Sequence, residues 1–213
     1  LFDLDGTLID SAPDLGGAAN ELRVSRGLSA LPYERFRPMV GAGARGMIQV
    51  AFDLGPEDER FAALREEFLH RYEQRMAVET RVFAAVLPLL DALDRAGRRW
   101  GIVTNKAARF TEPLVRALGL HERAATVIAG DTTPHSKPHP APLVEAARRV
   151  GLLPTQCMYV GDDVRDVQAG RAAGMLTVVA GWGYLGMGEP IEAWGADHIV
   201  QTPAELLNLL AMP

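Results

Sequence analysis

Two patterns of hydrophobic positions divide this chain of 213 residues. Between about residues 13 and 82, apolar residues recur three and four positions apart, as in residues 61–76, with charged residues between them. This spacing predicts amphipathic helices, and no run typical of a strand interrupts it. After residue 86, short apolar runs alternate with helical stretches. The chain therefore predicts a helical block inserted into an α/β protein.

The second pattern predicts a sheet of parallel strands. Strands are expected at 100–103, 126–128, 158–160, 177–179 and 199–200. Helices are expected at 87–95, after the strand at 100–103 through about residue 118, at 142–150, at 163–173 and at the end of the chain. Strands that alternate with helices form βα units, whose sheet is covered on both faces. We expect a Rossmann-like parallel sheet core from residues 1–12 and 83–213, and a small helical cap domain from residues 13–82.

Four groups of polar residues follow apolar runs. Asp3 and Asp5 end the first run, and their spacing places both side chains on one side of a strand. The other groups are Thr104-Asn105-Lys106, Ser136-Lys137-Pro138, and Gly161-Asp162-Asp163 with Asp166 one helical turn later. Any one group is also typical of a helix cap or a solvated charge. Ligands bind at the carboxyl ends of parallel strands, so we expect all four groups at one site.

The two close aspartates predict a cation site. Like charges repel unless a cation lies between them, and Mg²⁺ prefers carboxylate, water and phosphate oxygens. A solvated turn after the strand is the alternative interpretation, because Asp and Gly are common turn residues.

The order Asp-x-Asp-Gly-Thr, strand-Thr, Lys-Pro and Gly-Asp-x-x-x-Asp resembles the haloacid dehalogenase-like superfamily. The second aspartate resembles the phosphatases of that superfamily, and the helical insertion after the first motif resembles the cap of its phosphoglycolate phosphatase-like branch. The resemblance covers essentially the whole chain. It implies a Mg²⁺-dependent phosphomonoesterase that works through an aspartyl phosphate.

The resemblance also implies a role for each motif residue. Asp3 would attack phosphorus, and Asp5 would protonate the leaving alcohol and then activate water. Thr104 would hold a phosphoryl oxygen, and Lys137 would balance the negative charge. The implied metal ligands are Asp3, the main-chain carbonyl of Asp5, Asp162 and, as an outer ligand, Asp166, with Asp163 as the alternative for the outer position. The implied substrate-binding residues of the core are Gly6, Thr7, Asn105 and Lys106.

Residues 41–46 read G-x-G-x-x-G, a pattern also found in dinucleotide-binding loops. No buried strand precedes it, because Pro38 falls in the preceding run, and no βαβ unit surrounds it. We expect a turn between cap helices that brings Gly43 and Arg45 to the ligand, where Arg45 pairs with a carboxylate or another anionic group. An ordinary interhelical loop is the alternative, and Lys106 and Arg109 are further candidates for binding an anion.

Composition limits the partners of the protein. Hydrophobic residues make up 48% of the chain and charged residues 23%, as in ordinary globular proteins. The formal charge of −5 argues against nucleic acid as the main partner. No apolar run reaches the ~18 to 20 residues of a membrane helix, so no membrane association is expected.

The expected compartment is the cytoplasm. Cys157 is the only cysteine, so no intrachain disulfide can form, and no signal peptide is recognisable. The sequence begins at Leu1, inside an apolar run, and we expect a few residues to precede it. A monomer or a homodimer is expected.

Two substrates compete within the resemblance. The cap and Thr-Asn-Lys resemble phosphoglycolate phosphatases. The Gly-Ala-Arg loop, residues 100–120, Tyr184 and Trp194-Gly-Ala-Asp resemble the N-acetylmuramic acid 6-phosphate phosphatases of peptidoglycan recycling. Both substrates carry a carboxylate, so we expect a small carboxylate-bearing phosphomonoester. A phosphomutase and a non-catalytic phosphate-binding protein are the alternatives of other classes.

Overall fold

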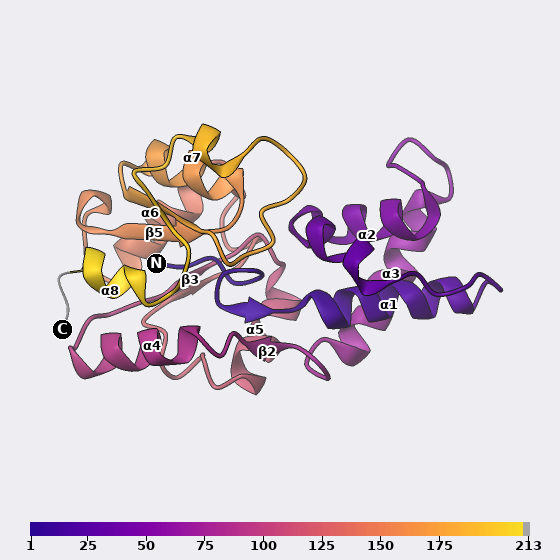
Figure 1. Ribbon diagram of the computed structural model, residues 1–213, viewed down its shortest axis with the longest axis horizontal. Coiled ribbons are helices and arrows are strands. Elements are labelled where there is room, and N and C mark those ends of the chain that lie inside the picture. Colours follow the sequence, from indigo (N-terminus) through magenta and orange to yellow (C-terminus); the bar gives the residue numbers. More distant parts are fainter. Residues whose placement is uncertain (211–213) are drawn as a thin grey trace.

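The structure is a computed structural model that describes residues 1–210. An α/β core and a group of cap helices lie side by side along the long axis of the molecule (Figure 1). The chain crosses between them at a short antiparallel ribbon, in which β1 (Ile9–Asp10) pairs with β2 (Arg81–Val82). None of the helices within residues 1–210 is long and apolar enough to cross a membrane.

The core contains a parallel sheet. Its strands are β3 (Ile102–Val103), β4 (Val127–Ile128), β5 (Met158–Gly161), β6 (Leu176–Ala180) and β7 (His198–Val200). Phe2 forms parallel bridges to Ile102 of β3 and Val160 of β5, which places the start of the chain in the middle of the sheet. The strand order is therefore β4-β3-Phe2-β5-β6-β7.

Helices cover both faces of this sheet (Figure 1). They are α4 (Val86–Arg95), α5 (Ala108–Ala117) and α8 (Glu205–Leu209) on one face, and α6 (Ala141–Arg149) and α7 (Val164–Ala173) on the other. Ile102 and Val160 pack with the first group, whereas their neighbours Val103 and Tyr159 pack with the second. Adjacent side chains of a strand point to opposite faces, which explains why these strands are apolar throughout. Short 3₁₀ turns at Pro154–Gln156 and Ile191–Trp194 complete the core.

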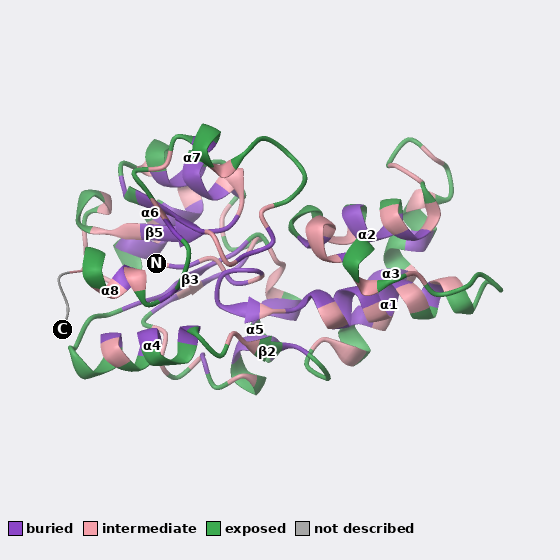
Figure 2. Cartoon of the chain, viewed as in Figure 1, coloured by how far each residue is buried: buried purple, intermediate pink, exposed green. Residues whose placement is uncertain are grey.

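The cap has a hydrophobic core of its own. It comprises α1 (Ala12–Val24), 3₁₀ segments at Tyr33–Arg35 and Arg37–Ala42, α2 (Gly43–Phe52) and α3 (Phe61–Arg75). Figure 2 shows that the buried residues of these helices follow the faces turned toward one another. Phe110 and Tyr184 of the α/β core pack into the same apolar cluster. The cap is therefore held to the core partly by shared hydrophobic contacts.

The predicted parallel sheet with a helical insertion is confirmed, and one detail is wrong. No strand was expected up to residue 82, yet β2 lies at that end of the block. Two residues are too few to produce a periodic pattern. The G-x-G-x-x-G segment spans the end of the Arg37–Ala42 turn and the start of α2, so a helical turn rather than a strand precedes it.

Candidate active site

A cavity of about 270 Å³ lies between the carboxyl ends of the core strands and the cap. Every group of polar residues singled out in the sequence contributes to its lining, through Asp3, Asp5, Thr104, Asn105, Lys106, Lys137, Asp162, Asp163 and Asp166. The cap contributes Leu15, Val40, Gly41, Gly43, Ala44, Arg65, Phe68, Leu69 and Tyr72. The fold thus joins four distant segments of the sequence at one site.

Lys137 is the central cation on the core side of the cavity. Its side chain is only 3% exposed, and Nζ lies 2.8 Å from an oxygen of Asp3 and 2.8 Å from an oxygen of Asp166. It also donates to the Val103 carbonyl and the Tyr159 hydroxyl, at 3.0 and 2.8 Å. Burial alone would lower the pKa of Lys137, but Asp166 and Asp3 outweigh burial and raise it. The ammonium therefore stays charged and holds both carboxylates in place.

The loop after β3 supports this lysine. The Asn105 amide donates to the Lys137 carbonyl, and the Lys137 N–H donates to the Asn105 side-chain oxygen, both at 2.9 Å. The Thr104 hydroxyl accepts the N–H of Lys106 at 3.1 Å. Because this bond uses the oxygen of Thr104 as an acceptor, its hydrogen is free to point to a ligand.

Three carboxylates meet beside Lys137. Asp3, Asp162 and Asp166 each offer an oxygen, and these atoms all lie within 4.8 Å of one another. The Thr7 hydroxyl donates to one oxygen of Asp162 and the Tyr184 N–H donates to the other, each at 2.8 Å. Asp162 is therefore fixed in orientation by the first motif and by the loop after β6.

The electrostatics of this group favour a bound cation. Burial, opposed by Lys137 and reinforced by Asp166 and Asp5, raises the pKa of Asp3 to about 7. Burial together with Asp3 and Asp166 also raises the pKa of Asp162 well above its usual range. One lysine does not neutralise three carboxylates, and a hard divalent cation with oxygen ligands fits them.

Gly6 and Thr7 contact Asp162 but are not among the residues that line the cavity. Gly6 has a φ of +87°, and a Cβ atom there would lie 2.1 Å from an oxygen of Asp162. A residue without a side chain is needed at this point. The substrate contacts predicted for Gly6 and Thr7 stay predictions, whereas the support that they give to Asp162 is direct.

Asp5 contacts a second lysine. Lys106 Nζ lies 3.1 Å from an oxygen of Asp5 and 4.8 Å from the centroid of the Tyr72 ring in the cap. The Ser11 hydroxyl donates to the same oxygen of Asp5 at 2.5 Å. Lys106 and Lys137 are the only lysines of the chain, and both line the cavity. All other cationic side chains apart from histidine are arginines.

Asp163 and Asp166 have different surroundings. Asp163 caps the N-terminus of α7 and forms an ion pair with Arg165, whose guanidinium also donates to the Gly41 carbonyl of the cap. Asp166 accepts the N–H of Asp163 at 3.0 Å and contacts Lys137. Burial would raise the pKa of Asp163, but Arg165 lowers it. Asp166, and not Asp163, belongs to the group of carboxylates that could hold a metal ion.

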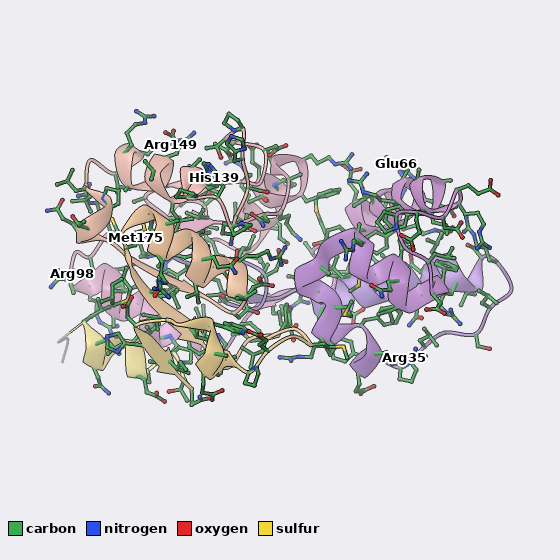
Figure 3. All side chains as sticks on the ribbon, turned by 90° about the horizontal axis from the view of Figure 1, so that it is seen from above. Arg35, Glu66, Arg98, His139, Arg149 and Met175 are labelled. Atoms are coloured by element: carbon green, nitrogen blue, oxygen red, sulfur yellow. The ribbon has the colours of Figure 1, made fainter. Side chains whose placement is uncertain are left out.

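The cap residues differ from the sequence expectation. Gly43 lines the cavity, but Arg45 is exposed and is not among the lining residues. The arginines that line the cavity are Arg65 of α3, Arg109 of α5 and Arg165, and the first two are not paired with an acidic residue of the core motifs. Arg65 and Arg109 are exposed. Figure 3 shows Glu66, the neighbour of Arg65, on the outer part of the cap, far from Arg98 and Met175 on the core.

Sequence reasoning missed the aromatic residues of the site. Tyr72 is almost fully buried and lines the cavity. It fits the apolar spacing of α3, so the sequence alone places it in the cap core. Tyr184 was noted only for its resemblance, although its hydroxyl accepts the N–H groups of Ser11 and Ala12 and donates to Asp10. It lies in a loop without a recognisable motif.

Comparison with known proteins decides the family. The sequence profile of haloacid dehalogenase-like hydrolases matches residues 1–180. The chain belongs to this family.

Relatives in the haloacid dehalogenase-like family are similar over nearly their whole length. A phosphoglycolate phosphatase of Xanthomonas campestris pv. campestris (strain 8004) is 46% identical over 100% of this chain and 96% of its own. The N-acetylmuramic acid 6-phosphate phosphatase of Pseudomonas aeruginosa is 40% identical over 99% of this chain and 93% of its own length. A crystal structure described as a predicted phosphoglycolate phosphatase from Haemophilus somnus 129PT has a TM-score of 0.85 at 29% identity. The match covers 98% of this chain and 96% of that one. With such homologues, this protein is a phosphoric monoester hydrolase.

Proposed function

We propose that this protein is a Mg²⁺-dependent phosphomonoesterase that hydrolyses a small carboxylate-bearing phosphomonoester through an aspartyl phosphate. The observation that carries the proposal is the position of Asp3, which faces the cavity between Lys137 and the carboxylates of Asp162 and Asp166. Phosphoglycolate phosphatases among the relatives support this class of substrate. The cytoplasm and a monomeric or homodimeric state remain part of the proposal.

The cation would be held by Asp3, the main-chain carbonyl of Asp5, Asp162 and Asp166. When bound, Mg²⁺ supplies positive charge that offsets the phosphoryl oxygens. Lys137 supplies the second positive charge of this site from the protein itself. Because its ammonium is fixed by four contacts, it needs little reorganisation as the reaction proceeds.

Asp3 and Asp5 divide the chemistry. An oxygen of Asp3 forms a bond to phosphorus while the ester P–O bond breaks, and the departing oxygen takes a proton from Asp5. A water molecule then gives its proton to Asp5 and its oxygen attacks phosphorus, which breaks the bond to Asp3 and releases phosphate. The Thr104 hydroxyl donates to a phosphoryl oxygen throughout.

The test is phosphate release, measured with and without metal. The panel contains 2-phosphoglycolate, N-acetylmuramic acid 6-phosphate, N-acetylglucosamine 6-phosphate and p-nitrophenyl phosphate. Activity should disappear in excess chelator and return with Mg²⁺, and Ca²⁺ should substitute poorly because its coordination is larger and looser. Full activity in chelator would refute the metal assignment. No phosphate from any ester would refute the hydrolase and favour a binding protein, and an isomerised sugar phosphate would indicate a mutase.

N-acetylmuramic acid 6-phosphate is the second candidate substrate. Relatives from two Pseudomonas species carry this activity in their names, at 40% and 41% identity. A preference for this ester over 2-phosphoglycolate in the same panel would decide for it.

A further inference from the structure

Lys106 is a buried cation with two partners from different parts of the molecule. Its side chain is 9% exposed, and its ammonium lies between the carboxylate of Asp5 in the core and the ring of Tyr72 in the cap. The carboxylate of Asp5 at 3.1 Å favours the charged form of this ammonium. The cavity therefore holds a fixed positive charge directly beside the carboxylate proposed as the acid.

The hydroxyl of Tyr72 has no hydrogen-bond partner, although Tyr72 is only 1% exposed. A buried polar group without a partner costs about 1–3 kcal/mol, so such a group calls for an explanation. Phe68 stacks on the Tyr72 ring and Phe110 packs against it at 5.5 Å between centroids, so aromatic surfaces surround much of this side chain. Burial raises the pKa of Tyr72, which keeps the phenol protonated and able to donate.

We propose that Lys106 and Tyr72 form the subsite for the anionic group of the leaving alcohol, namely a carboxylate. This inference rests on the proposed phosphatase function and adds the location and chemistry of substrate selection. A carboxylate can accept one bond from the ammonium, which also contacts Asp5, and one from the phenol, which has no other partner. Arg65 and Arg109 are exposed, where water screens their charge, and Arg165 is already paired with Asp163, so these arginines contribute less.

The position of the subsite limits the length of the substrate. Lys106 contacts Asp5, and Asp5 must contact the ester oxygen to protonate it. A carboxylate at Lys106 is therefore only a few bonds away from the ester oxygen. Esters of 2-hydroxy acids have this geometry, because their carboxyl carbon is two bonds from that oxygen. In N-acetylmuramic acid 6-phosphate the carboxylate is attached on another part of the sugar ring, so it does not fit.

Occupation of the subsite also affects Asp5. Lys106 and the Ser11 hydroxyl both contact the same oxygen of Asp5. A carboxylate at the subsite competes for the ammonium and loosens this contact, so that Asp5 is released to face the leaving oxygen. Substrates without a carboxylate leave the Lys106–Asp5 pair intact.

The experiment compares 2-phosphoglycolate with ethyl phosphate, which has the same two-carbon chain but no carboxylate. The wild type should prefer 2-phosphoglycolate in kcat/KM by at least about tenfold. Tyr72→Phe should lower kcat/KM for 2-phosphoglycolate about 10- to 100-fold, mostly through KM, and change ethyl phosphate less than about twofold. Lys106→Gln should reduce the preference further. Tyr33→Phe makes the same change in the cap outside the cavity and should leave both substrates unaffected.

Thermal unfolding separates binding from a structural role. Removal of an unpartnered hydroxyl should leave Tm of Tyr72→Phe unchanged or higher, whereas loss of a structural hydrogen bond would lower it. Equal losses on both esters, or no loss on 2-phosphoglycolate, would overturn the subsite. A wild type that hydrolyses both esters equally well, or prefers N-acetylmuramic acid 6-phosphate, would also overturn it while leaving the phosphatase intact. Only a wild type that releases no phosphate from any ester refutes both proposals.

Discussion

The two sides of the cavity are built in opposite ways. On the core side, charged groups contact one another directly, and Lys137 alone contacts two carboxylates, a carbonyl and a hydroxyl. The cap side is largely apolar, with Phe68 and Leu69 buried and one hydroxyl, that of Tyr72, left without a partner. The charged groups of the core side hold one another in place, whereas the cap side has a buried hydroxyl without a protein partner.

This difference separates chemistry from selection. A dense polar network fixes its members, which suits the handling of a phosphoryl group whose charge and shape are constant. An apolar wall with few polar groups distinguishes molecules by their fit and by a single contact. Changes to the core groups around Lys137 should therefore affect every substrate alike, and changes at Tyr72 and the cap wall should affect some substrates more than others.

The largest effect is expected for Asp3→Asn, which should lower kcat by more than about 10³-fold on every ester, because the amide cannot form the phosphoryl bond. The unfolding midpoint of the metal-free protein should stay unchanged or rise. Burial disfavours the ionised form of Asp3, and its pKa of about 7 means that a neutral residue suits this position near neutral pH. Turnover within about tenfold of the wild type would remove Asp3 from the role of nucleophile and weaken the contrast between the two sides.

A moderate effect is expected for Tyr184→Phe, which tests the connection between the two sides. The variant loses the hydrogen bonds of the hydroxyl to Ser11, Ala12 and Asp10, while the Tyr184 N–H still holds Asp162. We expect a loss of about 1–3 kcal/mol in the free energy of unfolding, measured by denaturant titration. A fall in kcat/KM of about 3- to 10-fold should accompany it for a cap-dependent substrate. An unchanged unfolding curve would show that the Tyr184 hydroxyl does not help to hold the cap on the core.

The smallest effect is expected for Arg45→Ala. Arg45 is exposed and does not line the cavity, so kcat/KM should change less than about twofold on 2-phosphoglycolate and on p-nitrophenyl phosphate alike. The sequence expectation was that Arg45 grips the substrate carboxylate. A selective loss of tenfold or more on 2-phosphoglycolate would support that expectation and move the anion contact from Lys106 to α2.

The same contrast explains what the sequence could predict. The core motifs follow strands, and the carboxyl ends of parallel strands converge, so local patterns were sufficient to bring Asp3, Thr104, Lys137 and Asp162 together. Residues of the cap reach the cavity only through the packing of helices. Spacing in α3 identifies Tyr72 as buried but does not distinguish a core position from a cavity wall. The orientation of Arg45 on α2 likewise depends on how that helix packs.

Three smaller features could not be predicted because they leave no local pattern in the sequence. The ribbon of β1 and β2 has two residues in each strand, which no periodicity can indicate. The contacts of Tyr184 join positions more than 170 apart in the chain, and such contacts leave no mark on a single sequence. The sequence could not decide whether Asp163 or Asp166 is the outer carboxylate of the cation site. Their partners in the structure, Arg165 for Asp163 and Lys137 for Asp166, distinguish the two.

The distribution of lysines has a practical consequence for labelling. The side chains of Lys106 and Lys137 both lie in the cavity, at 9% and 3% exposure. The other permanently charged cationic side chains of the sequence are arginines. Reagents that modify primary amines therefore find no lysine on the outer surface of the described chain. Within residues 1–210, reductive methylation with ¹³C-formaldehyde could place side-chain probes only at Lys106 and Lys137. Both would report from inside the site, one from beside Asp3 and one from beside Asp5.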